Sequence, residues 1–179
     1  MNRIRRIISR VLFYSIKVFL SFISLFNHRI YMRLYIPLLR QYGITMNGKP
    51  RYIAKSVKFD DFDKITLSER DVISGNVEFL THDYSYTTCL ISQGLVPDTD
   101  IAIVRDIKIG RNVFIGARSF IFPGTIIGDN CIIGAGSFVR GEIPEGSVCI
   151  GNPASVIKKI DELYNKKWKN LSISSLRKD

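Results

Sequence analysis

The sequence predicts an all-β solenoid, in which short strands wind in coils of constant length, with helices preceding it. Two observations carry this prediction. Between residues 103 and 139 an aliphatic residue recurs at every sixth position without a slip, and a glycine follows it in four units. A period of six accommodates the two-residue repeat of a strand and does not suit a helix. Constant units of this kind stack into a solenoid with the aliphatic residues along its axis.

The repeat has a regular downstream part and a less regular upstream part. The downstream leading residues are Ile103, Ile109, Ile115, Ile121, Ile127, Ile133 and Val139. The glycines that we expect to form tight turns are Gly110, Gly116, Gly128 and Gly134. The same register appears upstream at Leu67, Ile73 and Phe79, and Phe59 and Ile65 lie near it, displaced by a short insertion around "DDFDK".

Residues 82–102 interrupt the repeat. Phe79 and Ile103 keep the register across them, so the segment is expected to be a loop extruded from the solenoid. Long loops on rigid scaffolds usually carry function. The loop opens with His82, one of only two histidines in the chain, the other being His28.

Residues 1–49 are expected to form a basic helical arm. Residues 1–59 hold twelve Lys and Arg and no Asp or Glu, whereas the rest of the chain holds fourteen basic and sixteen acidic residues. Polar residues at helical spacing form one stripe of a first helix, and most of the remaining surface is apolar. The stripe comprises Arg3, Arg6, Arg10, Lys17, Ser21 and Ser24. A second helix, "YMRLYIPLLRQYG", is expected to end at Gly43.

Three arrangements of this arm stay open. It can pack on the domain or on a sister subunit, or residues 1–26 can make peripheral contact with a membrane surface, which the basic flank and apolar face suit. A membrane span is less favoured, because the strongest apolar run, 11–26, contains Lys17 and falls short of about 20 residues. A signal peptide would need a small-residue cleavage site, which is missing. Nucleic acid is not expected as a partner, since no recognition motif accompanies the charge.

The composition indicates one domain with an appendage. The chain has 179 residues, of which 46% are hydrophobic, enough for a sizeable core. Its three cysteines, Cys89, Cys131 and Cys149, lack metal-ligand spacing and cannot all pair. We therefore expect no metal and a reduced, cytoplasmic location, with a peripheral position at the inner face of the plasma membrane as an option.

The repeat resembles that of the hexapeptide-repeat acyltransferases over roughly residues 50–160. The run "IGRNVFIGARSFIFPGTIIGDNCIIGAGSFVRGEIPEGSVCIGNPASVIKKI" is similar to the maltose, galactoside and nodulation O-acetyltransferase group, and "LTHDYS" resembles acetyltransferases of polysaccharide biosynthesis. The resemblance implies a left-handed parallel β-helix over 50–157, between the arm and a C-terminal helix and tail over 158–179. It also implies a homotrimer with each active site between two solenoids.

Acyl transfer from a thioester to an alcohol needs a base for the hydroxyl proton. His82 is the only candidate base on the predicted solenoid, and a histidine has an ordinary pKa suited to neutral pH. The family's catalytic histidine likewise follows a coil and opens the extruded loop. The resemblance therefore implies that His82 is catalytic.

Several neighbours of His82 are candidates for contacting the acceptor. Asp83 either orients the imidazole or starts the loop. Tyr84 and Tyr86 are candidates for lining an acceptor pocket, and Asn76 for bonding the acceptor. Asp60 and Asp61 occupy a region where related enzymes contact the acceptor, although a solvated turn is favoured for them.

The resemblance also implies a groove for acetyl-CoA, the expected co-substrate. Its residues would be Ala117 and Ala135, through their backbone N–H groups, with Arg140 near the carrier and Lys158 near its nucleotide phosphates. Ser155 stands where relatives often have a basic residue, which removes one phosphate contact that Lys159 is a candidate to replace. The alternative for both lysines is a solvated helix start.

The function implied is acetyl-CoA-dependent O-acetylation of a sugar hydroxyl in the biosynthesis of a bacterial surface polysaccharide such as capsule, O-antigen or exopolysaccharide. The acceptor is expected to be a carbohydrate, with a lipid-linked glycan favoured by the basic arm. Rival enzymes are N-acetyltransferases of amino sugars and antibiotic-inactivating acetyltransferases. Serine acetyltransferases normally carry a larger helical N-terminal domain. A γ-type carbonic anhydrase needs three zinc-binding histidines, and a non-catalytic scaffold would give His82 no role.

Overall fold

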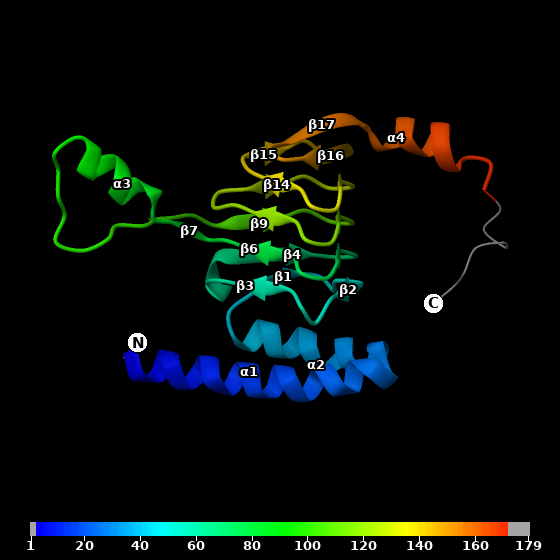
Figure 1. The fold of residues 1–179 in the computed structure, drawn as a ribbon. Helices are drawn as coiled ribbons and strands as arrows, with labels where there is room; N and C mark the ends of the chain where they lie inside the picture. The colour runs from blue at the N-terminus through cyan, green and yellow to red at the C-terminus, as the bar shows by residue number, and fades with distance from the viewer. Residues whose placement is uncertain (1–2, 172–179) are drawn as a thin grey trace.

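The computed structural model describes residues 3–171, with the side chains of Ile8 and of residues 10–171. Figure 1 shows a stack of coils with two long helices across its first end, a short helix beyond its last end, and a helical arm projecting from one side. Within residues 3–171, no helix combines the length and the apolar character that a membrane-crossing segment requires.

The coils build three stacked sheets, which the chain visits in turn. The first sheet has the order β1-β4-β9-β12-β15, the second β2-β5-β10-β13-β16-β17 and the third β3-β6-β11-β14. The first comprises β1 (Thr45–Asn47), β4 (Ile65–Ser68), β9 (Ile107–Ile109), β12 (Ile126–Ile127) and β15 (Glu142–Ile143). The second comprises β2 (Tyr52–Ile53), β5 (Val72–Ile73), β10 (Phe114–Ile115), β13 (Ile132–Ile133), β16 (Ser147–Gly151) and β17 (Ala154–Lys159). The third comprises β3 (Lys58–Phe59), β6 (Glu78–Phe79), β11 (Phe120–Ile121) and β14 (Phe138–Val139).

The six-residue period has a direct structural cause. Ile115 pairs with Ile133 and Ile109 with Ile127, each in parallel register, so one coil spans three units of six. The aliphatic residue that recurs at every sixth position points into the stack, and Ile115, Ile121 and Ile133 are fully buried there. The parallel β-sheets that the repeat predicts are confirmed.

The four glycines have a different role from the one predicted. Gly116 does not adopt positive φ, and the left-handed residue of its corner is Arg118, with φ of 61°. A Cβ on Gly116 would lie 2.4 Å from the backbone nitrogen of Ala135 in the next coil, and one on Gly128 would lie 2.6 Å from that of Glu145. These glycines therefore allow neighbouring coils to approach closely, rather than supplying the turn conformation.

The segment expected as an extruded loop has structure of its own. β7 (His82–Asp83) pairs antiparallel with β8 (Ile103–Val104) in a separate two-stranded sheet, and α3 (Ser85–Ser92) lies between them. Thr87 of α3 is tied back to Ile101, whose N–H donates to the threonine hydroxyl at 2.7 Å. Ile103 is 37% exposed in β8, so its assignment to the buried repeat was wrong, and the buried positions resume at Ile107.

The N-terminal residues form a helical hairpin, α1 (Arg3–Phe26) and α2 (His28–Gln41). Asn27 caps α2, because its side-chain oxygen accepts the N–H groups of Arg29 and Ile30. α2 ends before Gly43, which has φ of 115°, and the predicted end of this helix is confirmed.

The last coil is closed by an antiparallel strand. β17 returns along β16, and α4 (Ile160–Leu163) and the π-helical turn η2 (Tyr164–Trp168) follow it. Lys158 and Lys159 belong to β17 rather than to a helix. Their backbone pairs with Val148 and Ser147 of β16. Lys159 is also the N-cap residue of α4, so the alternative reading as a helix start is correct for Lys159 and wrong for Lys158.

Candidate active site

His82 lies where the chain leaves the coil stack. It follows the buried Thr81 at the corner after the third sheet, and its own strand β7 belongs to the projecting arm. The imidazole is 35% exposed. A rigid coil therefore fixes one side of the histidine, and the other side faces solvent.

Two carboxylates lie against the imidazole. The His82 Nδ1 atom is 3.6 Å from Oδ2 of Asp60 and 3.6 Å from Oδ2 of Asp61. Both aspartates follow β3, one coil below, in the turn that leads to the 3₁₀ helix η1 (Phe62–Lys64). The expectation that this pair forms a solvated turn was wrong in part, since both side chains are only about one-third exposed.

Thr81 holds the carboxylate pair in place. Its hydroxyl donates to Asp61 Oδ2 at 2.8 Å, and its backbone N–H donates to Asp60 Oδ2 at 3.3 Å. Arg10 of α1 reaches the same turn, donating to the carbonyl oxygen of Asp60 at 3.3 Å and lying 3.8 Å from Asp61 Oδ1. The pair is thus positioned by the adjacent coil and by the N-terminal helix.

This arrangement favours one protonation state of the imidazole. Two carboxylates beside Nδ1 favour a proton on that nitrogen, which leaves the lone pair of Nε2 available to accept a proton. The same carboxylates stabilise the imidazolium that forms when Nε2 is protonated. The site can therefore act as a general base with an orienting carboxylate pair.

Asp83 and Tyr84 lie on other sides of His82. The Asp83 carboxylate accepts the N–H of Ser85 at 2.9 Å and lies 3.8 Å from Arg140. The Ser85 hydrogen bond lowers the pKa of this carboxyl. The orienting position proposed for Asp83 is therefore occupied by Asp60 and Asp61. The Tyr84 ring meets the imidazole edge-on, with 5.4 Å between ring centroids, whereas Tyr86 is exposed on α3.

Arg140 lies at the same corner of the coil stack as His82. It follows β14 at the corner after the third sheet, two coils beyond His82. Its guanidinium lies 4.6 Å from the centroid of the Phe122 ring and reaches Asp83. Arg140 therefore links the coil stack to the base of the projecting arm.

The other groove candidates lie at a different corner, after the second sheet. Ala117 and Ala135 occupy adjacent coils there, and the N–H of Gly136 donates to the Ala117 carbonyl at 2.8 Å. Asn76 lies at the same corner, next to Gly75, whose carbonyl accepts the Arg118 N–H. The structure thus groups Asn76 with the groove candidates rather than with His82. Within residues 3–171, neither the Ala117 N–H nor the Ala135 N–H donates a backbone hydrogen bond to another protein group.

The basic candidates near the chain end are placed by β17. Lys158 is half-buried in this strand, and Ser155 is exposed near its start. The Lys159 ammonium donates to the Glu145 carbonyl at 3.1 Å. Lys159 is therefore engaged with the last coil and is a poor replacement for the missing cation at Ser155.

Comparisons with known proteins agree with this architecture. Residues 106–140 match the family model described as the hexapeptide repeat of succinyl-transferase. A protein of Escherichia coli K12, provisionally named a lipopolysaccharide biosynthesis O-acetyl transferase, is 30% identical over 127 residues, which cover 66% of this chain and 63% of that protein. A provisionally named acetyltransferase of Saccharomyces cerevisiae is 37% identical over 127 residues, covering 70% and 62%. The chain thus spans just under two thirds of the length of these curated relatives.

Solved structures give the same result. A maltose O-acetyltransferase from Clostridium difficile is 32% identical, with a TM-score of 0.50, over 69% of this chain and 73% of that one. A galactoside acetyltransferase in complex with coenzyme A shares the fold, with a TM-score of 0.63 at 22% identity over 89% and 82% of the two chains. With its repeat, its parallel sheets and these relatives, the chain belongs to the hexapeptide-repeat acetyltransferases.

Proposed function

We propose that this protein transfers an acetyl group from acetyl-CoA to a hydroxyl of a sugar. The observation that carries the proposal is the position of His82, whose Nδ1 lies 3.6 Å from both Asp60 and Asp61 at the break in the coil stack. The family of the chain supplies the class of reaction, and this site supplies its base.

The position of the imidazole supports the following steps. Nε2 of His82 takes the proton of the acceptor hydroxyl as its oxygen attacks the thioester carbonyl carbon. The C–S bond then breaks, and the imidazolium returns the proton to the CoA sulfur. The products are the acetyl ester and free CoA. Asp60 and Asp61 stabilise the positive charge that the imidazole carries between these steps.

The carrier would be held by groups from both corners of the coil stack. The Ala117 and Ala135 N–H groups suit the polar atoms of the thioester and the pantetheine arm, since a backbone donor does not depend on its side chain. Arg140 and Lys158 are cations suited to the phosphates.

The sugar acceptor and the polysaccharide pathway are supported by the relatives. The similar Escherichia coli protein is named for lipopolysaccharide biosynthesis and the Clostridium difficile enzyme for maltose. We place the reaction in the biosynthesis of a surface polysaccharide, in the cytoplasm. The cysteines suit a reduced compartment, since Cys89, Cys131 and Cys149 are all free.

We further propose a left-handed coil and a homotrimer. His82 and the pair Ala117 and Ala135 lie at different corners of one chain, so a groove between two neighbouring solenoids would bring the two corners together. The outward surfaces of the second and third sheets also carry aromatic side chains, among them Phe114, Phe120 and Phe138, which are exposed or half-buried in one chain. Light scattering should give the mass of three chains, and a fully active monomer would contradict the assembly.

The test of the function is an acceptor screen. Purified protein and acetyl-CoA are incubated with nucleotide sugars, free sugars, amino sugars and lipid-linked glycans, and products are detected by mass spectrometry. A gain of one acetyl group on a sugar hydroxyl supports the proposal. Acetylation confined to amines would indicate an N-acetyltransferase, and no product with any acceptor would contradict the proposal.

A further inference from the structure

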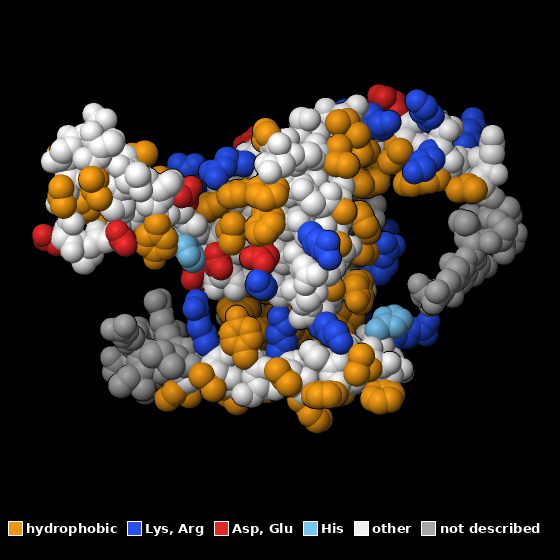
Figure 2. All heavy atoms as spheres, viewed as in Figure 1, with side chains coloured by type: hydrophobic (Ala, Val, Ile, Leu, Met, Phe, Trp, Pro, Cys, Tyr) orange, Lys and Arg blue, Asp and Glu red, His pale blue; other side chains and the backbone are white. Residues whose placement is uncertain are grey.

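The surface of α1 that faces away from the coil stack is mostly apolar, with the exposed Ser15 as a polar residue among its side chains. Its exposed large side chains follow helical spacing, and each is between 54% and 90% exposed. They are Ile8, Val11, Leu12, Val18, Phe19, Phe22, Leu25 and Phe26, and we call them the outer face of α1. Figure 2 shows hydrophobic side chains along the lower edge of the molecule, on the side of α1 remote from the coils. A water-facing helix would carry polar residues there.

The polar side of α1 is turned inward instead. The Lys17 ammonium donates to the Val57 carbonyl at 2.7 Å, and its burial lowers the pKa of this lysine to about 8. Arg10 bonds the turn of Asp60. Phe13, between these two along the helix, is fully buried, with its ring centroid 4.8 Å from that of Phe62. These contacts prevent α1 from rotating to bury its outer face.

α1 also lies flat on the first end of the coil stack (Figure 1). The inward contacts extend along the helix from Arg10 to Leu20, which is 5% exposed. Any planar surface that covers the outer face must therefore lie parallel to the helix axis and across the end of the stack.

The charge around this face indicates what covers it. Residues 1–59 hold twelve basic and no acidic residues. Arg29 and Arg33 of α2 are exposed beside Ile30 and Leu34, which are 46% and 47% exposed. Two copies of this face placed against each other would bring these cations together without a counter-charge. An anionic surface with an apolar interior matches both the charge and the side chains.

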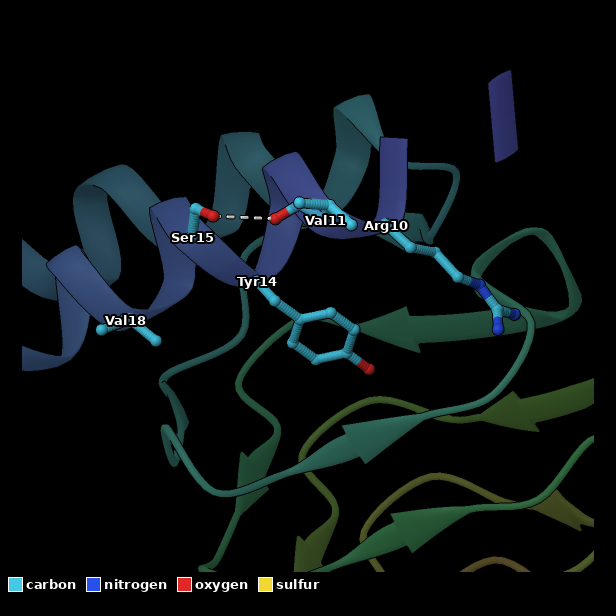
Figure 3. A pocket seen from close by; sticks show the side chains of 5 residues that line it. All are labelled: Arg10, Val11, Tyr14, Ser15 and Val18. Carbon is cyan, nitrogen blue, oxygen red and sulfur yellow. Dashed lines mark hydrogen bonds between the residues drawn. The ribbon is translucent and has the colours of Figure 1, made fainter. Parts of the chain in front are cut away.

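We propose that the outer face of α1 binds the surface of an anionic phospholipid bilayer, with the helix lying in the interface. The flank of α1 lies between the outer face and the coils, and it carries a pocket of about 460 Å³ (Figure 3). The pocket is lined by Arg10, Val11, Tyr14, Ser15 and Val18. In this view Tyr14 and Arg10 point from the helix toward the coils. Arginine and tyrosine are favoured at the boundary between lipid and water.

The same contacts connect the bilayer to the candidate base. Arg10 lies 3.8 Å from Asp61 Oδ1, and Asp61 Oδ2 lies 3.6 Å from His82. His82 would thus be separated from the bilayer by one helix, about 10 Å across, and one arginine side chain. An acceptor glycan carried on a membrane lipid can then reach the base. This last inference about the acceptor rests on the proposed function, whereas lipid binding does not.

The experiment measures sedimentation of the full-length protein with sucrose-loaded vesicles, without any activity assay. Vesicles of phosphatidylcholine alone are compared with vesicles of equal parts phosphatidylcholine and phosphatidylglycerol. The test variant combines Phe19→Ser, Phe22→Ser and Phe26→Ser. The matched control combines Leu95→Ser and Val96→Ser, which are 61% and 76% exposed on the projecting arm. Light scattering of all proteins reports their oligomeric state.

We expect the wild type and the control to bind anionic vesicles. Their binding should weaken at high salt, and they should bind neutral vesicles less strongly than anionic ones. The test variant should lose at least about tenfold in partition coefficient, because apolar burial supplies much of interfacial binding. Wild-type protein that stays in solution with both vesicle types would overturn the proposal. A test variant that binds like the wild type would also overturn it. So would an oligomer that dissociates only in the test variant while vesicle binding is unchanged, since a second copy would then cover this face.

Discussion

Nδ1 of His82 and Oδ2 of Asp61 lie 3.6 Å apart, although the two residues come from neighbouring coils. The distance is set by the coil stack, because Thr81, the residue before the histidine, donates its hydroxyl to the same Oδ2 atom at 2.8 Å. Asp60 stands at an equal distance from the imidazole. A carboxylate beside a histidine orients the ring and selects its tautomer. In this protein, both Asp60 and Asp61 are placed to do so.

Removal of the Asp60 and Asp61 carboxylates should slow the chemical step without weakening the binding of acetyl-CoA. We expect Asp60→Asn and Asp61→Asn each to lower kcat about tenfold. The double variant should lose more than about 100-fold, the product of the two single losses, because each carboxylate partly replaces the other in a single variant.

The matched control for this pair is Asp63→Asn, an exposed aspartate of the same turn. It should leave kcat unchanged. Equal effects of all three substitutions would mean that the turn is merely distorted, and an unaltered kcat in the double variant would show that the carboxylates do not position His82.

Lys158 should affect carrier binding alone. We expect Lys158→Ala to raise KM for acetyl-CoA roughly 5- to 10-fold, because one charge-assisted contact to a phosphate is lost. kcat should stay close to that of the wild type. Lys166→Ala, in the exposed turn η2, serves as the comparison of equal charge. Steady-state kinetics that give both variants the same KM would remove Lys158 from the carrier groove.

Asp71 makes the stability of the coil stack depend on pH. Its carboxylate is fully buried and accepts the N–H groups of Ser68 at 2.7 Å and Val113 at 3.0 Å. Burial raises the pKa of this carboxyl from 3.8 to about 7, and the two hydrogen bonds oppose the rise only in part. The folded protein thus keeps a proton that the unfolded chain releases near pH 4. The stability that this proton contributes is complete below about pH 4 and is lost as the pH rises to about 7.

The measurement is the free energy of unfolding in urea between pH 4 and 8, for the wild type and for Asp71→Asn. Across this range the wild type should lose on the order of 4 kcal/mol relative to the variant, which lacks the titrating group. The difference between the two proteins cancels the contributions of the other carboxylates. Parallel curves would show that Asp71 titrates alike in the folded and unfolded chains.

Close approach of the coils should make Gly116 much less replaceable than Gly136. A Cβ on Gly116 would lie 2.4 Å from a backbone nitrogen, whereas one on Gly136 would meet nothing within 4 Å but would sit at φ of 70°. Gly116→Ala should therefore cost about 3 kcal/mol of stability, and Gly136→Ala only about 1 kcal/mol. Urea unfolding at one protein concentration compares them, and equal losses would refute the role assigned to Gly116.

The parallel sheets and their buried residues could be predicted because a rigid repeat leaves little choice. Ile115, Ile121 and Ile133 follow one another at a fixed spacing, and each coil repeats the environment of the last. Ile103 shows the limit of this reasoning. It keeps the register by position, but the chain between it and Phe79 leaves the stack, so Ile103 pairs with Asp83 in the projecting arm instead.

The sequence repeat does not predict that Asp60 and Asp61 lie beside the imidazole of His82, because the insertion after β3 obscures the register of these two residues. Phe59 pairs with Phe79 in the third sheet, and this pairing places Asp60 and Asp61 below Leu80 and Thr81. Counting forward from the aromatic pair would have found them beside His82. The position of Arg10 could not be read from the sequence, since it depends on which side of α1 packs against the coils.

The most direct test of the account is His82→Ala, assayed for acetyl transfer from acetyl-CoA and, separately, for CoA affinity by calorimetry. We expect kcat to fall roughly 10²- to 10⁴-fold, the usual contribution of a positioned general base. CoA affinity should change little, and the acid-side limb of the pH–rate profile should disappear. If CoA affinity collapses as well, His82→Asn replaces the ring with a smaller polar group and repeats the test. Activity within about threefold of the wild type in a variant that binds CoA normally would contradict the assignment of His82 as the base.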